Sequence, residues 1–171
     1  MTTTVEPVLH ESRAYTAHDH TTCINSALER ATVICQEKGQ RLTALRKQVL
    51  ELVWQSHKPV GAYDVLAMLS KGQERPAAPP TVYRALDFLL EQGLIHRIAS
   101  LNAFIGCSCP DTPHAGVFLI CEKCRTTREL DSHDNIQNLK NAADSTGFKT
   151  SKTLIEISGL CPCCQEEASD E

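Results

Sequence analysis

Two cysteine pairs in the last third of the chain constrain its fold more than any other feature. They are Cys121-Glu122-Lys123-Cys124 and Cys161-Pro162-Cys163-Cys164. The C-x-x-C spacing lets two thiolates from one tight turn bind the same tetrahedral ion, and two such turns supply the four sulfurs of a structural zinc site. The sequence therefore predicts that one zinc ion joins Cys121, Cys124, Cys161 and Cys164. The same spacing also serves thiol redox chemistry, which remains an alternative.

The stretch between the two pairs, residues 125–160, is longer than the roughly 15 to 20 residues of a compact zinc ribbon. It must therefore fold into elements of its own, and we expect a strand, a helix and a strand. Cys163 is an ambiguity in the second pair, but C-x-C fits one tetrahedral ion less well than C-x-x-C. We therefore assign Cys161 and Cys164 to the ion and treat Cys163 as a neighbour that could replace a ligand or oxidise.

Nine cysteines in one chain raise the question of disulfides. No apolar run approaches the roughly 18 residues of a membrane span, and the polar N-terminus lacks the basic and apolar regions of a secretory signal. We therefore expect a soluble, cytoplasmic protein. Thiols stay reduced in that compartment, so clustered cysteines indicate metal binding before disulfides.

The net charge of −4 argues against a nucleic-acid partner only until its distribution is considered. Basic residues outnumber acidic ones in residues 21–100, whereas acidic residues are in excess in residues 1–20 and 101–171. Only the middle of the chain is therefore suited to approach a polyanion. An ordinary solvated surface explains the same pattern, so charge alone does not identify the partner.

Residues 1–20 lack apolar periodicity and are expected to form a mobile tail. His18-Asp19-His20 in this tail could contact a metal, but we interpret these residues as solvated and incidental. Apolar residues at helical spacing then predict three helices, each with a terminating or capping residue. These helices run from residue 21 to Gly39, from the N-cap Thr43 through Val53, and over residues 61–69.

A fourth helix is predicted from Pro79-Pro80 to Gly93, with proline in its first turn and glycine at its end. Its inner face carries Val82, Ala85, Leu86, Leu89 and Leu90, and its outer face carries Tyr83, Arg84, Asp87 and Glu91. An exposed Tyr-Arg pair near a helix N-terminus is typical of a recognition helix in the DNA major groove. An ordinary amphipathic helix has the same pattern and remains an alternative.

The elements after Gly93 indicate an α+β protein of two domains. Two short β-like runs, 94–99 and 103–106, predict a hairpin that completes a winged-helix DNA-binding domain over residues 21–106. Residues 107–114 are the expected hinge, and residues 115–171 the expected dimerisation and zinc domain. That domain should contain strands at 116–121, 126–130 and 153–158 and a helix from the N-cap Ser132 to Gly147. A sheet of only three short strands is marginally stable on its own. We therefore expect it to pair with a second copy of the chain.

Four further potential ligands lie near the expected hinge. They are His96, Cys107, His114 and Glu129. Each taken singly is more often a structural residue than a ligand. Two imidazoles, one thiolate and one carboxylate would together form a tetrahedral site with a soft ligand, which favours Zn²⁺ over Fe²⁺ or Mn²⁺.

Four motifs, in the expected order over residues 22–167, resemble the ferric uptake regulator family of metal-dependent repressors. The resemblance is strongest to the zinc-sensing branch, the zinc uptake regulators. The chain lacks the His-rich run of the iron and peroxide branches and has only Pro113-His114-Ala115 there. The motifs are Arg41-Leu42-Thr43-x-x-Arg46, Pro79 to Leu89, Ile120-Cys121-x-x-Cys124 and Gly159-Leu160-Cys161-x-x-Cys164.

The resemblance implies a homodimer that binds palindromic double-stranded operator DNA and represses zinc-uptake genes when zinc is bound. It implies about two Zn²⁺ per monomer, one structural at the four paired cysteines and one regulatory at His96, Cys107, His114 and Glu129. It also implies DNA contacts by Tyr63, Thr81, Tyr83 and Arg84, with Arg84 reading a base. No membrane or small-molecule substrate is expected.

Other functions are compatible with parts of this pattern. A family member could sense another metal, or could sense oxidation through Cys109 or Cys163. A zinc or thiol-redox enzyme is the more distant alternative, because four protein ligands leave no open position on zinc. The sequence also groups no nucleophile, base and orienting residue. We therefore expect a regulator rather than an enzyme.

Overall fold

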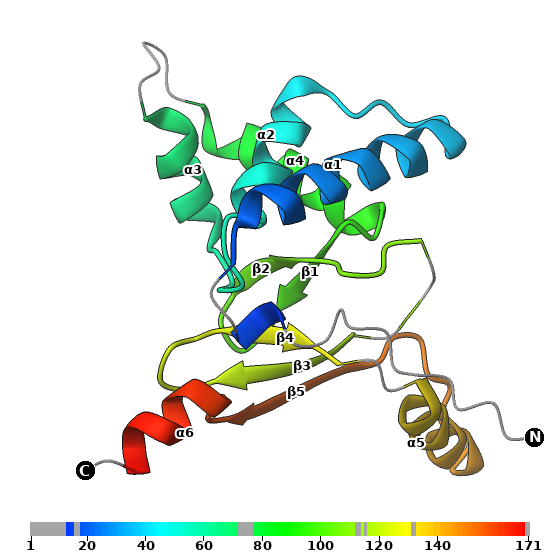
Figure 1. Ribbon diagram of the computed structural model, residues 1–171. Coiled ribbons are helices and arrows are strands. Elements are labelled where there is room, and N and C mark those ends of the chain that lie inside the picture. The colour runs from blue at the N-terminus through cyan, green and yellow to red at the C-terminus, as the bar shows by residue number, and fades with distance from the viewer. Residues whose placement is uncertain are drawn as a thin grey trace, which may run out of the picture.

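The computed structural model describes residues 13–15, 18–71, 77–111, 114, 116–130 and 133–169. Four helices form one end of the molecule, a two-stranded hairpin lies beneath them, and a three-stranded sheet lies beneath the hairpin (Figure 1). The elements are η1 (Arg13–Tyr15), α1 (His20–Glu37), α2 (Ala44–Val53), α3 (Ala62–Ser70), α4 (Pro79–Glu91), β1 (Ile95–Ile98), β2 (Ala103–Gly106), β3 (Gly116–Cys121), β4 (Thr127–Glu129), α5 (His133–Ser145), β5 (Leu154–Gly159) and α6 (Pro162–Ser169).

Local capping signals explain where the first helices begin and end. The Asp19 side chain caps α1 by accepting a hydrogen bond from the Thr21 N–H at 2.9 Å. The Thr43 hydroxyl caps α2 by accepting from the Arg46 N–H at 3.4 Å, as the sequence predicted. Gly93 follows α4 with φ of +74°, a conformation that glycine adopts without steric cost. The four predicted helices are therefore confirmed, with boundaries that differ by a few residues at most.

The helical end has one hydrophobic core, to which α4 contributes the largest share. Val82, Ala85, Leu86 and Leu89 are buried in it, as the helical spacing predicted. The Arg46 guanidinium of α2 lies 3.5 Å from the centre of the Phe88 ring, which adds a cation–π contact between two helices. This packing fixes the outer face of α4 relative to the rest of the domain.

The hairpin β1–β2 connects the two halves of the molecule. Its Ile98 and Ile105 pack against Phe118 and Ile120 of β3 in a small separate core. The Glu156 carboxylate of β5 accepts hydrogen bonds from the N–H groups of the hairpin turn, at 2.6 Å from Ala99 and 3.1 Å from Ser100. The hairpin therefore rests on the lower sheet and is held there by apolar contact and by hydrogen bonds.

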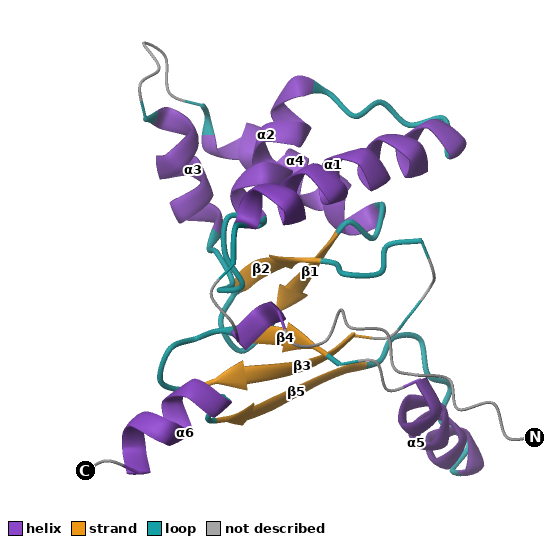
Figure 2. Ribbon diagram, viewed as in Figure 1, coloured by secondary structure: helices purple, strands orange, loops and turns teal. Residues whose placement is uncertain are grey.

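The lower sheet has the strand order β4-β3-β5, with β4 antiparallel and β5 parallel to β3. The three strands and the helix α5 were predicted, although Ser132, its expected cap, lies outside the described residues. The helix α6 was not predicted, because the second cysteine pair was interpreted only as a turn. Helices α5 and α6 lie near opposite ends of the sheet (Figure 2).

The lower domain exposes several large apolar side chains. Exposed fractions are 47 % for Ile157 and 37 % for Leu154 on the edge strand β5, and 54 % for Leu139 on α5. Phe148 and Leu160 are also exposed. Exposed apolar residues on and near an edge strand are typical of a surface that binds another chain. Among the described residues, no helix is long and apolar enough to cross a membrane.

Candidate metal centres

The first candidate centre gathers the four predicted cysteines at one end of the sheet. Their sulfur atoms all lie within 4.8 Å of one another. The distance from Cys124 Sγ to Cys161 Sγ is 3.7 Å, and a tetrahedron with Zn–S bonds of about 2.3 Å has edges of about 3.8 Å. The thiols are therefore placed at the separation that one shared ion requires.

A tight turn at the end of β3 brings Cys121 and Cys124, the first cysteine pair, together. The Cys121 carbonyl accepts from the Arg125 N–H at 2.9 Å, and Arg125 has a left-handed backbone with φ of +64°. Cys163 lies outside the group, exposed, with its thiol donating to the Tyr15 carbonyl at 3.1 Å. The geometry thus favours Cys161 and Cys164 over Cys163 as the second pair.

The electrostatics of this cluster favour a cation. Burial works against a charged thiolate, but the backbone N–H groups of Cys124 and Cys161 lower the pKa of Cys121 to about 6. Burial and the neighbouring thiols raise the pKa of Cys164 to about 12. Four adjacent sulfurs cannot all ionise without a compensating positive charge, which a divalent ion supplies.

The second candidate centre gathers the other predicted ligands from four different segments. His96 is in β1, Cys107 follows β2, His114 is in the hinge and Glu129 is in β4, and their ligand atoms all lie within 4.8 Å of one another. We call this group the hinge cluster. Its members share no local sequence motif, so their convergence was expected only from the family resemblance.

The distances in the hinge cluster match a tetrahedral site. His96 Nε2 and His114 Nε2 are 3.2 Å apart, and Cys107 Sγ is 3.5 Å from His114 Nε2. Zn–N bonds of about 2.0 Å and Zn–S bonds of about 2.3 Å give tetrahedral edges of about 3.3 and 3.5 Å. Glu129 Oε1 lies 3.0 Å from His96 Nε2 and 2.6 Å from His114 Nε2.

Glu129 is oriented by a partner on its other oxygen. Ser108 donates to Oε2 through its hydroxyl at 2.9 Å and its N–H at 3.3 Å, which leaves Oε1 directed at the histidines. Burial raises the pKa of this carboxyl, but the hydrogen bond from His96 and the charges of His96 and His114 outweigh it and lower the pKa to about 2. Such an outer hydrogen bond fixes the geometry of a metal ligand.

Arg30 ties helix α1 to the same hinge. It donates to the Ser108 carbonyl at 2.8 Å and pairs with Asp111 at 2.5 Å. Both groups of this ion pair are substantially exposed, so its contribution to stability is small. These two contacts show that the hinge touches helix α1 of the helical domain.

The residues expected to contact DNA lie on the surface of α3 and α4. Tyr63, in the first turn of α3, is 75 % exposed, and Tyr83 of α4 is 42 % exposed. Thr81 and Arg84 of α4 are exposed as well. These side chains are therefore accessible to a partner while the opposite face of α4 holds the core together.

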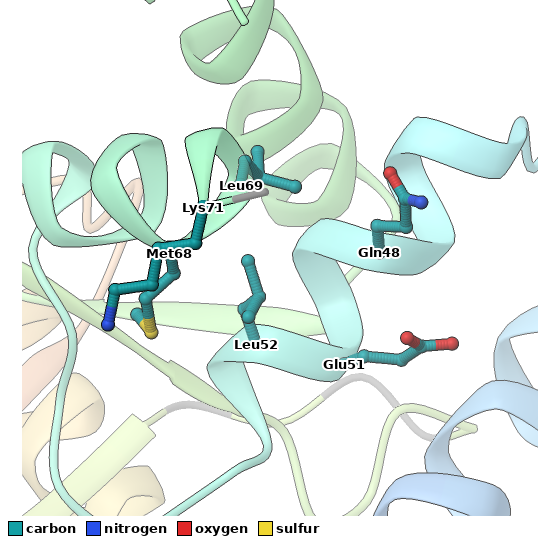
Figure 3. A pocket seen from close by; sticks show the side chains of 6 residues that line it. All are labelled: Gln48, Glu51, Leu52, Met68, Leu69 and Lys71. Carbon is teal, nitrogen blue, oxygen red and sulfur yellow. The ribbon is translucent and has the colours of Figure 1, made fainter. Parts of the chain in front are cut away.

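A cavity of about 220 Å³ lies between α2 and α3, away from both clusters. Leu52 and Leu69 face it, whereas the charged ends of Glu51 and Lys71 point in opposite directions (Figure 3). A ligand site normally has polar groups that converge on one point. Those that line this cavity do not converge, so it is a gap in packing rather than a candidate active site.

The structure brings together a third group of potential ligands, which the sequence analysis did not assign to a metal site. It consists of His18, His20, Cys23 and His57, again with ligand atoms within 4.8 Å of one another. His18 and His20 are half-buried, so the expectation that they are solvated is wrong. The spacing His18-x-His20-x-x-Cys23 was a visible signal, but the fourth member, His57, is distant in sequence.

Comparison with known proteins gives the same family for this architecture. The ferric uptake regulator family model matches residues 37–158. The zinc uptake regulation protein of Escherichia coli (strain K12) is 37 % identical over 146 residues, which cover 85 % of each chain. A zinc uptake regulator complexed with zinc and DNA superposes with a TM-score of 0.80 at 36 % identity, covering 85 % of this chain and 97 % of that one.

The third relative, XcZur, has been solved in two forms, each 39 % identical to this chain. The holo form superposes with a TM-score of 0.76 and the apo form with 0.50. Each superposition covers 83 % of this chain. It covers 99 % of the XcZur chain in the holo form and 97 % in the apo form. The arrangement described here is thus closer to the holo form. From the family model and these relatives together, the chain belongs to the ferric uptake regulator family.

Proposed function

We propose that this protein is a zinc-responsive transcriptional repressor, which binds palindromic operator DNA as a homodimer when the hinge cluster holds zinc and represses zinc-uptake genes. One observation carries the proposal. The hinge cluster takes His96 from the hairpin of the helical domain, Cys107 and His114 from the two ends of the hinge, and Glu129 from the lower domain. A single ion bound there joins the helical domain to the lower domain.

The relatives support the metal and the partner. The Escherichia coli relative is a zinc uptake regulation protein, and a solved relative holds both zinc and DNA. The donor set of the hinge cluster agrees with zinc, because a thiolate with two imidazoles and one carboxylate is softer than the sites that select Mn²⁺ or Mg²⁺. We assign about two Zn²⁺ per monomer, a structural ion at the four cysteines and a regulatory ion at the hinge.

The regulatory ion acts by restricting the orientation of the two domains. Without it, the helical domains of a dimer sample several separations, and ordering them on DNA costs entropy. With it, the two α4 helices are held at one separation, which suits major grooves one or two helical turns apart on a palindrome. Zinc therefore tightens DNA binding, and by linkage DNA tightens zinc binding by the same factor.

The exposed apolar surface of the lower domain is the proposed dimer interface. Strand β5 is at the sheet edge, and its Ile157 is 47 % exposed in the single chain. A second copy would cover this surface and extend a sheet that is small on its own. The lower domain thus serves for dimerisation and the helical domain, with α3 and α4, for binding DNA.

The chemistry proposed here is binding rather than catalysis. Both zinc sites draw all four ligands from the protein, so neither offers a position for a reacting water. A regulator of this kind works on DNA in the cytoplasm, where its thiols are kept reduced. Neither a membrane nor a small-molecule substrate is part of the proposal.

The test is a selection of binding sites from random DNA. The purified protein, with zinc added, is mixed with a pool of random duplexes, and bound DNA is amplified and sequenced. We expect one palindromic motif to be enriched, and the enrichment to disappear when a moderate chelator removes the labile zinc. Enrichment that is equal with and without the chelator, or that requires Fe²⁺ or peroxide instead, contradicts zinc-responsive repression.

A further inference from the structure

The group His18, His20, Cys23 and His57 lies where the N-terminal segment enters α1, apart from the two centres described above. We propose that these four side chains form a third metal site, with three imidazoles and one thiolate that bind Zn²⁺. We call it the N-terminal site. The proposal does not depend on DNA binding or on the hinge cluster.

The distances within the group are those of ligands around a common centre. His18 Nε2 is 3.3 Å from Cys23 Sγ and 3.2 Å from His57 Nε2. Tetrahedral zinc gives separations of about 3.3 Å between two nitrogens and about 3.5 Å between a nitrogen and a sulfur. One nitrogen of His18 thus faces two other ligand atoms at once, as it does when all three point to one ion.

The three histidine rings are gathered in the same way. Their centroids are 4.6 Å apart for His18 and His20 and 5.0 Å apart for each of the other two pairs. His20 Nδ1 is buried and has no hydrogen-bond partner in the part of the chain that the structure describes. A buried ring nitrogen without a partner costs free energy, and coordination of an ion provides a partner.

Local structure holds the ligands in place without an ion. Asp19 caps α1, which sets the backbone between His18 and His20. His20 and Cys23 are three residues apart in the first turn of α1, so they lie on the same face of the helix. His57 comes from the loop after α2, and its carbonyl accepts from the Thr127 N–H of β4 at 2.8 Å.

The protonation state of His57 is suited to binding a metal. Burial, with the charges of His20 and His18 acting in the same direction, lowers its pKa to about 4. The neutral imidazole is the form that coordinates metal ions. All four positions around the ion are taken by side chains, so the site is structural or sensory rather than catalytic.

An ion at this site would fasten the N-terminal segment to the helical domain. It joins the start of α1 to the loop after α2, and the hydrogen bond from Thr127 to His57 continues the connection into β4. In the preceding turn η1 (Figure 1), the Tyr15 ring lies 5.9 Å from the Arg128 guanidinium of β4 and packs against the four-cysteine cluster. The N-terminal site would therefore fasten the N-terminal segment to the helical domain beside that domain's contact with β4, separate from the hinge cluster.

The test uses Co²⁺, whose absorption spectrum reports both coordination geometry and thiolate ligands. The full-length Cys107→Ala variant, which lacks one hinge ligand, is titrated with Co²⁺ after its tightly bound structural zinc has been counted by mass spectrometry. We expect one Co²⁺ per chain with tetrahedral visible bands and a thiolate-to-cobalt charge-transfer band. Adding His57→Gln should weaken this binding about tenfold or more, since loss of even an outer partner of a ligand costs about 10- to 100-fold.

Matched variants separate the site from other thiols. In the same background, Cys23→Ser should abolish the charge-transfer band, whereas Cys109→Ser, which changes an exposed cysteine outside all three groups, should preserve it. The proposal is overturned if the Cys107→Ala protein binds no Co²⁺. It is also overturned if the spectrum persists unchanged in Cys23→Ser and His57→Gln. Circular dichroism establishes that each variant is folded, and no outcome depends on whether the protein represses transcription.

Discussion

Cys107 and Glu129 enter the hinge cluster in opposite protonation states. Burial, together with the charge of Glu129, raises the pKa of the Cys107 thiol, whereas the pKa of Glu129 is lowered to about 2. At neutral pH the carboxylate is therefore already ionised and the thiol still carries its proton. Zinc can bind Cys107 only by displacing that proton.

This difference predicts how zinc affinity depends on pH. Because zinc displaces the proton of Cys107, the affinity of the hinge site should rise with pH, by about tenfold per unit for one released proton between pH 7.5 and 8.5. Competition with a zinc chelator of known affinity measures the change, and calorimetry in buffers of different ionisation enthalpy counts the proton. A zinc affinity that is constant over this interval contradicts the assignment of a protonated thiol.

Arg84 is the residue assigned to read a base. If its guanidinium contacts a guanine through two hydrogen bonds, Arg84→Ala should lose about 1–3 kcal/mol of binding free energy on the selected operator, and discrimination at one base pair should disappear. Binding is compared on the operator and on duplexes changed at single positions. An equal loss on every duplex makes Arg84 a phosphate contact instead.

At the scale of elements, helix α4 divides its two faces between the core and the surface. Leu86 is fully buried among the helices, whereas the neighbouring Asp87 is exposed. Leu86→Ala should reduce the free energy of unfolding by about 2–5 kcal/mol, because it leaves a cavity, while Asp87→Ala should change it by less than about 0.5 kcal/mol. Denaturant titrations of the two variants test this, and equal effects would show that the helix is packed differently.

Most helices and strands could be predicted because their signals are local. Thr43 as a cap, Gly93 as a stop and the apolar spacing of Val82, Leu86 and Leu89 each depend only on neighbouring residues. Helix α6 was not predicted, because it is short and because the pair Cys161 and Cys164 at its start was interpreted as a metal-binding loop. Local signals therefore predict an element well unless another motif occupies the same residues.

The candidate sites could be predicted only in part, since their ligands meet through the fold. The four paired cysteines have a recognisable spacing, and the hinge ligands were proposed from the family resemblance. The N-terminal site was not recognised, because His57 reaches His18 and Cys23 only through the packing of the loop after α2 against the start of α1. Long-range convergence of this kind has no signature in a single sequence.

At the scale of the whole molecule, the exposed apolar surface of the lower domain predicts a dimer. Ile157 is exposed in the single chain, so Ile157→Asp should leave the monomer folded but place a charge in the interface. Sedimentation equilibrium should then show a shift from dimer to monomer. Gln55→Asp, which adds the same charge to the exposed surface of the other domain, should remain dimeric. An Ile157→Asp protein that is still dimeric contradicts this interface.

The most direct test of the account measures how zinc changes the affinity for the selected operator. The Kd for DNA is determined for the wild type and for Cys107→Ala, each with its structural zinc retained, with and without added zinc. The account predicts that zinc tightens DNA binding by the wild type about 5- to 150-fold, the usual range of allosteric coupling, and leaves Cys107→Ala unchanged. The same tightening in a folded, dimeric Cys107→Ala protein would mean that the hinge cluster is not the switch.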